Sequence, residues 1–514
     1  MNHHNTIDDA RGHFDFGNRA ASDGRFGDAA KAFRQAANTA SVVWRDAEAS
    51  QEVRSLAARL SADSTYSAGM SAVRLGDPGE HMQAAILIGV EIYELESLED
   101  DVRLHGLYRA QCCAFELAHA VSPEDTLQAE EYFIDAVGCA QALPNLGEVD
   151  AQKVVRVLAN AAAASYALAQ LRRAREARGF KTDLEKALEL GQAALDMPEL
   201  RGMMQAETYL VLADASYDLA MTVEDPSKAA DHLRNALGYT RESSEAPGAD
   251  GVLQGQAMLR GANYACAYGL YLRNEDFEGG VEALEGAIGL ALAVADQDHL
   301  PMDLRAPAWE TAIRTGQNIG LLFKERDMAT ARNAFEASAG LAQRAASTQG
   351  LPAESRALCL YLGANASLEQ AILMQALAGD EKLPDALALL RKARDLARTA
   401  MDSPGCIGDI AARSCLLTCG VSGRFLRTLN DPADAAAITT ELEKIEVFGQ
   451  RAAETKGAMD EHRATGASFA ADAATQLATR TKDPRKAAEL KHRADALRKL
   501  QKVLQPEEHS HHHH

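Results

Sequence analysis

Small and large apolar residues alternate at helical spacing along most of the chain. In the recurring pattern, a small residue is followed four positions later by a large one and three positions after that by a second small one, as at Ala129, Phe133 and Ala136. Residues spaced in this way lie on one face of an α-helix. The pattern therefore predicts helices whose small residues let a neighbour approach and whose large residue fills the remaining gap. It recurs at Ala187/Gly191/Ala194, Ala229/Leu233/Ala236, Gly280/Leu284/Ala287, Ala331/Phe335/Ser338, Ala386/Leu390/Ala393 and, more loosely, Ala487/Lys491/Ala494.

Asp-Pro dipeptides followed by helix-forming residues mark predicted helix starts. They occur at Asp77, Asp225, Asp431 and Asp483. An aspartate before a helix accepts hydrogen bonds from free backbone N–H groups, and proline at the first helical position lacks a donor that would be unpaired anyway. Each dipeptide is therefore expected to open a helix.

The helix-start signals recur at a fixed interval. Asp431 and Asp483 are 52 residues apart, and Asp225 and Asp431 are 206 apart, which is four steps of about 51.5. Tyr166, Tyr217 and Tyr268 follow one another at intervals of 51. Fixed periods in this range are typical of repeat arrays in which each unit buries its apolar face against the next. We therefore expect about ten helix pairs with helices of around 20 residues each.

Residues 14–37 contain the clearest single unit. Their small, glycine and aromatic positions closely resemble the tetratricopeptide repeat, and the positions that match are Phe16, Gly17, Ala20, Gly24, Phe26, Ala29, Phe33 and Ala36. The standard repeat has 34 residues, so the units of this chain are most similar to long-unit bacterial arrays of that kind. The resemblance implies an all-α, right-handed superhelical solenoid of antiparallel helix pairs. It is expected to cover residues 1–506 as one domain, with basic capping helices at about 482–504 and a disordered, His-rich tail, resembling an expression tag, at 507–514.

Composition and charge restrict the classes of partner. The chain has 514 residues and a formal net charge of −21, which argues against nucleic acid as the main partner because such binding depends on cationic side chains. The N-terminal residues contain no apolar signal segment, and the longest apolar run, residues 286–295, is too short to cross a membrane. Eight cysteines without disulfide-framework spacing favour a reducing compartment, so we expect a cytoplasmic protein.

Known catalytic and cofactor motifs are absent from the sequence. It contains no phosphate-binding glycine loop, no dinucleotide fingerprint, no zinc-protease motif and no serine nucleophile elbow. Cys406, Cys415 and Cys419 are interpreted as structural cysteines rather than metal ligands, since buried cysteine behaves as a small hydrophobic residue. The sequence therefore predicts no catalytic residue, metal or cofactor.

A recurring asparagine is the main candidate for function. It occupies comparable places in the first helix of several predicted pairs, the helix that lines the concave groove of a solenoid. A side-chain amide both donates to and accepts from an extended peptide backbone. Arg156 and Arg314 each precede an asparagine by four residues, a spacing similar to the basic-x-x-x-Asn pairs of tetratricopeptide domains that grip a carboxylate. Bonding within or between helices is the alternative. The predicted groove residues are Asn18, Arg156, Asn160, Asn263, Arg314, Asn318 and Asn365.

The C-terminal segment is locally basic. It is either a polar cap on the end of the array or a docking patch for an acidic partner. The candidate docking residues are Lys482, Arg485, Lys486, Lys491 and Arg493.

Three functional hypotheses remain open at this stage. The leading one is a non-enzymatic scaffold or adaptor that binds a protein or peptide partner in its groove, with no nucleic acid and no membrane. The second is a peptide-responsive sensor that controls an effector protein. The third is an all-α enzyme with a cleft between helices that acts on a small molecule. Self-association through the array ends is a further hypothesis.

Overall fold

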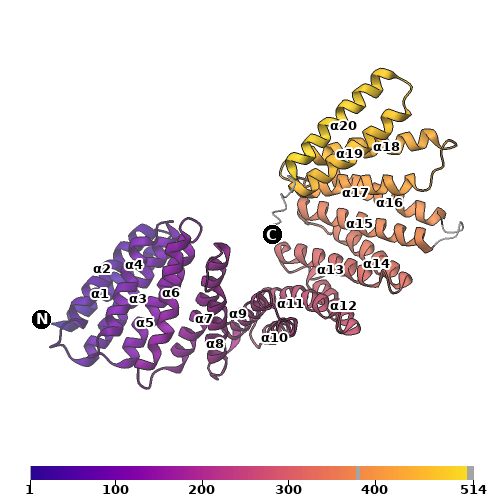
Figure 1. Cartoon of the computed structure of the whole chain (residues 1–514). Helices are drawn as coiled ribbons and strands as arrows, with labels where there is room; N and C mark the ends of the chain where they lie inside the picture. The colour runs from indigo at the N-terminus through magenta and orange to yellow at the C-terminus, as the bar shows by residue number, and fades with distance from the viewer. Residues whose placement is uncertain (1, 378–382, 506–514) are drawn as a thin grey trace, which may run out of the picture. The chain divides into compact units, whose positions relative to one another are not determined.

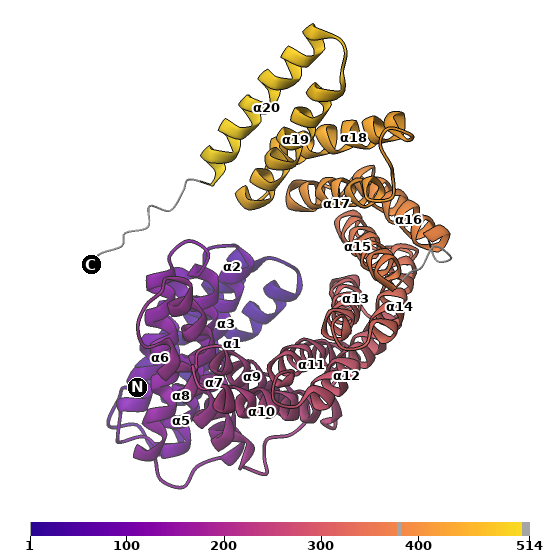
Figure 2. The same ribbon diagram turned by 45° about the vertical axis from the view of Figure 1, so that its right-hand side comes forward.

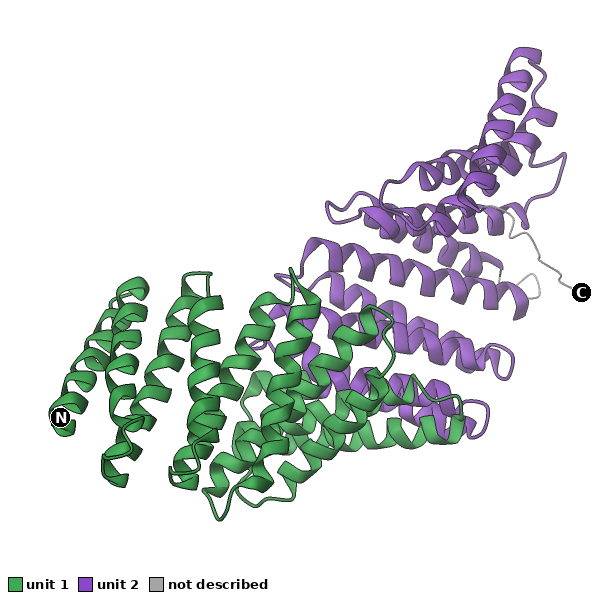
Figure 3. Ribbon diagram, turned by 60° about the vertical axis from the view of Figure 1, so that its left-hand side comes forward, with its two compact units in different colours: residues 1–257 green, residues 258–514 purple. Residues whose placement is uncertain are grey.

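The computed structural model describes residues 2–377 and 383–505, and within them the chain forms twenty α-helices and one 3-10 helix (Figure 1). Consecutive helices pack as antiparallel pairs, which confirms the predicted all-α fold of about ten helix pairs. The chain divides into two compact units, residues 1–257 and residues 258–514 (Figure 3). The boundary lies within α11 (Gly251–Leu272). The prediction of one domain over residues 1–506 stays a prediction, and residues 507–514 lie outside the described part.

The helices of the first unit precede α11. They are α1 (His3–Ser22), α2 (Phe26–Trp44), α3 (Gln51–Arg74), α4 (Gly79–Glu94), α5 (Asp100–Val121), α6 (Thr126–Ala142), the 3-10 helix η1 (Leu143–Asn145), α7 (Ala151–Ala174), α8 (Phe180–Leu195), α9 (Gly202–Ala220) and α10 (Pro226–Glu245).

The helices of the second unit follow α11. They are α12 (Phe277–Ala295), α13 (Met302–Phe323), α14 (Met328–Ala346), α15 (Ala353–Leu377), α16 (Leu383–Met401), α17 (Gly408–Leu426), α18 (Ala435–Glu454), α19 (Asp460–Arg480) and α20 (Pro484–Leu504).

The odd-numbered helices begin at nearly constant intervals. From α3 to α15 they start at residues 51, 100, 151, 202, 251, 302 and 353, so successive starts differ by 49 or 51 residues. The period of about 50 residues read from the sequence is therefore the length of one helix pair with its turns.

The small-large-small pattern forms the contact surface inside the pairs. Phe133 and Phe335 are buried, as are the small residues that flank them. A Cβ atom placed on Gly320 would lie 2.7 Å from the ring of Phe335, and one on Gly17 would lie 2.7 Å from the ring of Phe33. Glycine is needed at both places because the helices approach too closely for any larger side chain.

The odd-numbered helices form one layer of each unit and the even-numbered helices the other. In the first unit α1, α3, α5, α7 and α9 contact one another in turn, and in the second unit α13, α15, α17 and α19 do so. No contact of similar extent joins two even-numbered helices in the described residues. The odd layer is therefore the more closely spaced one, and Figure 2 shows α13 and α15 side by side. We call its solvent-facing surface the odd-helix face.

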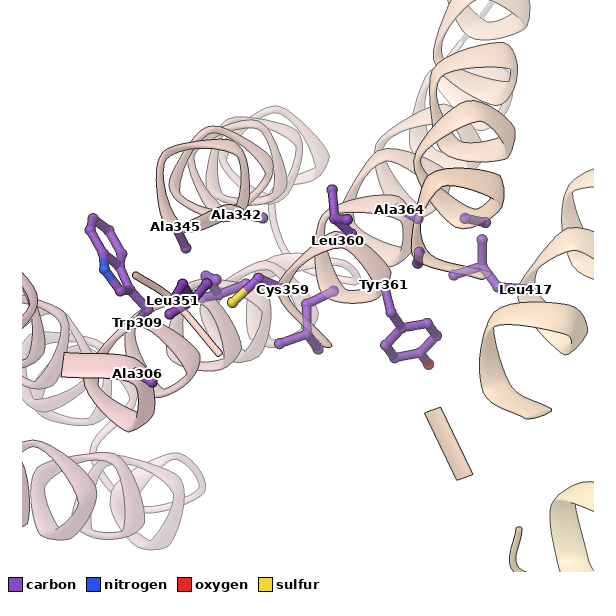
Figure 4. Packing of buried hydrophobic residues seen from close by; sticks show 14 of the residues in the cluster. Ala306, Trp309, Ala342, Ala345, Leu351, Cys359, Leu360, Tyr361, Ala364 and Leu417 are labelled. Atoms are coloured by element: carbon purple, nitrogen blue, oxygen red, sulfur yellow. The ribbon is translucent and has the colours of Figure 1, made fainter. Parts of the chain in front are cut away.

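The hydrophobic core runs along the stack between the two layers. In the second unit a continuous cluster joins Trp309 of α13, Cys359 and Tyr361 of α15, and Leu417 of α17 (Figure 4). Helices α7 and α15 are long and apolar enough to cross a membrane by length and composition. Both contact neighbouring helices within their units, and the apolar window of α15 is 72% buried whereas that of α7 is 44% buried.

The Asp-Pro prediction is confirmed at Asp225 and Asp483. The Asp225 carboxylate accepts a hydrogen bond from the backbone N–H of Ser227 at 3.0 Å, and α10 begins at Pro226. Asp483 caps α20 in the same way. The prediction is wrong at Asp431, because α18 begins only at Ala435.

The reason for the difference at Asp431 is a competing partner. The Asp431 carboxylate accepts a hydrogen bond from Arg480 of α19 at 2.8 Å, so it does not cap α18. Asp77 also provides no side-chain cap, and α4 begins at Gly79, after the proline. The small-large-small pattern at Ala487, Lys491 and Ala494 does not form a buried surface. Lys491 of α20 is exposed because no later helix of the described chain covers it.

Candidate functional site

The predicted groove asparagines all lie on odd-numbered helices. In the first unit Asn18 is on α1 and Asn160 is on α7; in the second unit Asn263, Asn318 and Asn365 are on α11, α13 and α15. Asn18 and Asn263 are exposed, whereas the other three are half-buried. The structure brings Asn263 of α11 and Asn318 of α13 into contacts between these two helices. It records no side-chain contact between Asn18 and another helix.

Two asparagines of the second unit are held by contacts between neighbouring odd helices. The Thr311 hydroxyl of α13 donates to the amide oxygen of Asn263 on α11 at 2.9 Å. The amide nitrogen of Asn318 on α13 lies 3.7 Å from the sulfur of Cys266 on α11. Both amides are therefore placed on the odd-helix face between the same two helices. Among the described residues, the Asn263 nitrogen and the Asn318 oxygen have no further hydrogen-bond partner.

Arg314 lies one turn before Asn318 and is exposed. Burial raises the pKa of the neighbouring Glu310 carboxyl, and the charge of Arg314 opposes that shift. On the adjacent α15, Asn365 follows Tyr361 by one turn, and the guanidinium of Arg413 from α17 lies 4.8 Å from the Tyr361 ring. The odd-helix face of this unit thus carries amide, hydroxyl, guanidinium and carboxyl groups.

The first unit has a cluster that the sequence analysis missed. Asp63 of α3 accepts hydrogen bonds from His105 Nε2 and Arg109 Nε of α5, both at 2.8 Å. Burial tends to raise the pKa of Asp63, but the hydrogen bond from His105 and the charges of His105 and Arg109 outweigh it and hold the pKa below its usual value. His105 and Arg109 are one turn apart, which was a readable signal. Their partner lies 42 and 46 residues upstream, and only the stacking register reveals it.

Two further predicted residues of this unit, Arg156 and Asn160, lie on α7, which packs against α5. Arg156 of α7 is exposed and close to the Tyr108 hydroxyl of α5. Burial raises the pKa of Tyr108, and Arg156 acts against this increase. Asn160 is on the same face of α7, one turn after Arg156, and is half-buried. The role of all seven predicted groove residues stays a prediction.

The predicted docking patch is only partly free. Lys482, Arg485 and Lys491 are exposed at α20, but Arg493 forms an ion pair with Glu446 of α18 and Lys486 lies 3.9 Å from Glu443. These two cations attach the last described helix to its neighbour. That geometry suits the capping interpretation of the basic segment.

A cavity of about 810 Å³ lies in the first unit and is lined by residues of α4 to α8. Most of its lining is apolar, including Ile86, Val90 and Ile134. It contains none of the residues predicted from the sequence.

The cysteines of the described chain are unpaired. Burial raises the pKa of Cys415 to about 11 and that of Cys419 to about 12, as expected for thiols packed among apolar groups. Among the described residues no three histidine, cysteine, aspartate or glutamate side chains are grouped so as to hold a metal ion.

No family model matches the chain, and no curated protein sequence matches it at a significant level. The chain is distantly similar to solved helical-repeat structures. The nuclear import adaptor Nro1 of S. pombe has 12% sequence identity and a TM-score of 0.42, over 66% of this chain and 99% of that chain. The apo form of RapI has 11% identity and a TM-score of 0.37, over 85% of this chain and 98% of that chain. A Rap protein complexed with competence and sporulation factor has 12% identity and a TM-score of 0.25, over 86% of this chain and 99% of that chain.

Proposed function

We propose that this chain is a non-enzymatic, cytoplasmic protein that binds an extended segment of a protein or peptide partner on its odd-helix face. The observation that carries the proposal is the pair Asn263 and Asn318, which adjacent helices hold on one face. The unpaired thiols of the chain support a reducing compartment.

The two amides offer complementary groups. Because Asn263 uses its oxygen to accept from Thr311, its NH₂ group remains for a ligand carbonyl. Because Asn318 directs its NH₂ group at Cys266, its oxygen remains for a ligand N–H. An extended peptide presents a carbonyl and an N–H at regular intervals along one edge. This arrangement recognises main chain without requiring a particular side chain, which suits an adaptor.

The chemistry of this face favours binding over catalysis. The amides and the hydroxyl that would contact the ligand do not ionise near neutral pH, and a guanidinium stays protonated. These groups form hydrogen bonds and ion pairs with a ligand. They do not form the nucleophile and base pair that hydrolytic enzymes require.

The test is affinity capture from the source cytosol with the wild-type chain and an Asn263→Ala, Asn318→Ala double variant. Asn333→Ala is the matched control, since Asn333 is an exposed asparagine of the same unit on the even-numbered helix α14. We expect a partner that the wild type and the control retain and the double variant loses. Equal capture by all three proteins would refute this binding surface, provided that circular dichroism shows unchanged helicity.

A further inference from the structure

Arg109 of α5 is a fixed arginine with unused donors. Its Nε atom is bound to Asp63 at 2.8 Å, and its guanidinium lies 4.3 Å from the ring centroid of Tyr66 and 5.6 Å from that of Tyr108. Asp63 is itself oriented by His105 at 2.8 Å. The side chain of Arg109 is one-quarter exposed, at 24%. Its two terminal amino groups have no hydrogen-bond partner among the described residues.

Three further cations interact with groups that surround this arginine, and none of them forms an ion pair among the described residues. Arg156 of α7 interacts with Tyr108, which Arg109 also contacts. Lys153 of α7 is close to Arg59 of α3: burial lowers the pKa of Lys153, and the positive charge of Arg59 lowers it further. Nearby carboxylates, Asp63 among them, act in the opposite direction without restoring the ordinary pKa. Because α5 packs against both α3 and α7, three neighbouring helices contribute cations to this part of the odd-helix face.

We propose that these side chains form an oxyanion site on the odd-helix face of the first unit, with Arg109 as its central ligand. The site would bind a carboxylate or phosphoryl group of a bound peptide. This inference rests on the proposed function, since the peptide supplies the anion, but it uses residues of the first unit only.

The geometry explains why Arg109 suits an oxyanion. The planar guanidinium donates two parallel hydrogen bonds to a carboxylate or phosphoryl group when its orientation is fixed. Here Asp63 fixes one edge and the tyrosine rings fix the plane, so little side-chain entropy is lost on binding. Arg156 and Lys153 add positive charge from the neighbouring helix. The overall charge of −21 repels anions elsewhere, so attraction must be local to this cluster.

The experiment is calorimetric titration of the full chain at low salt with three probes. These are inorganic phosphate, an acetylated hexaglutamate peptide and an acetylated peptide with one phosphoserine among serines. Binding of the glutamate peptide alone identifies a carboxylate ligand, and binding of phosphate and the phosphopeptide identifies a phosphoryl ligand. Either result supports the site. Absence of binding by all three probes overturns it.

Variants then locate the bound anion. We expect Arg109→Gln to weaken binding by about tenfold to a hundredfold, the usual loss for a charge-assisted hydrogen bond. Arg156→Gln and Lys153→Gln should each weaken it by about threefold to tenfold. Arg156 is exposed, so its variant tests the site even if Arg109→Gln disturbs folding. Lys181→Gln is the control. It removes an exposed charge from the even-numbered helix α8 and should leave the affinity for the probe within about twofold of the wild-type value. Equal losses in all four variants would overturn the site.

The two proposals fail separately. If a cellular partner depends on Asn263 and Asn318 but no anionic probe binds, the oxyanion site is wrong and the proposed function stands. If the anionic probes bind and lose affinity with Arg109→Gln, but no partner depends on the asparagines, the site stands and the proposed surface in the second unit is wrong.

Discussion

The Nε atom of Arg103, at the start of α5, donates a hydrogen bond of 2.7 Å to the backbone carbonyl of Tyr93, at the end of α4. The last carbonyls of a helix have no partner within the helix and carry partial negative charge, so a guanidinium there satisfies both needs. The contact fixes the turn between one pair and the next. The same bond, always ten residues back, joins Arg54 to Trp44, Arg305 to Ala295 and Arg463 to Ala453.

Removing one of these arginines should destabilise its unit. Arg305 is buried, and its Nη2 atom also binds Asp298, so Arg305→Met leaves a helix-end carbonyl unpaired. We expect a loss of about 1–3 kcal/mol in the free energy of unfolding, measured by urea denaturation. Arg391→Met is the control, because Arg391 is an exposed arginine of the same unit. Equal urea midpoints for the two variants would contradict the role of the bond.

The close approach of α13 and α14 should make Gly320 intolerant of a side chain. Its Cβ would meet three atoms of the buried Phe335 ring at 2.7 to 2.9 Å, so we expect Gly320→Ala to cost about 1–3 kcal/mol through overpacking. Gly340 of α14 has open space around its Cβ position and is the matched control. Gly340→Ala should stabilise the helix by about 0.5–1 kcal/mol, because alanine loses less backbone entropy. The melting temperature should fall for Gly320→Ala and rise for Gly340→Ala. A change of the same sign in both variants would count against close packing at Gly320.

The Asp-Pro dipeptides should differ in their contribution to stability. Asp225→Ala removes a side-chain cap from α10 and should cost about 1 kcal/mol. Asp77→Ala removes a carboxylate with no capping bond and should have about half that effect or less. Chemical denaturation of both variants measures the two losses in the free energy of unfolding. Identical losses would mean that the capping bond at Asp225 contributes nothing specific.

Glu130 should contribute to the acid sensitivity of the first unit. The hydrogen bond from Arg175 lowers the pKa of its carboxyl; burial acts against this, and the charges of Arg175 and Arg172 add to the lowering. A carboxyl whose pKa is lower in the folded state stabilises the fold fully above its unfolded pKa of about 4.3, and this stabilisation is lost as the pH falls through the folded value.

Glu130→Gln should therefore lower stability at neutral pH and reduce its further loss below about pH 4.3, as followed by urea midpoints between pH 7 and pH 3. The neighbouring Glu131 is exposed, and Glu131→Gln serves as the control with the wild-type acid response. A Glu130→Gln variant that kept the full wild-type loss below that pH would rule out the assigned contribution.

Helix pairing and its period could be predicted from the sequence because they depend on local chemistry. The triplet Ala229, Leu233 and Ala236 is fully buried, as its spacing predicts, and Asp225 caps α10 through a bond to a residue two positions away. The helix start predicted at Asp431 was wrong because of a contact that is distant in sequence. The Asp431 carboxylate is bound by Arg480, 49 residues later, and no local pattern contains that competitor.

The sequence by itself determined the class of fold, the length of the repeating unit and the helices on which the asparagines lie, because apolar periodicity and capping act within a few residues. Only the tertiary structure decided which side chains of neighbouring helix pairs meet within each compact unit. Thr311 reaches Asn263 over 48 positions, whereas Arg109 reaches Asp63 over 46. The number of residues between two contacting side chains depends on the register in which neighbouring helix pairs stack. Which side chains meet on the odd-helix face is therefore decided by helix packing.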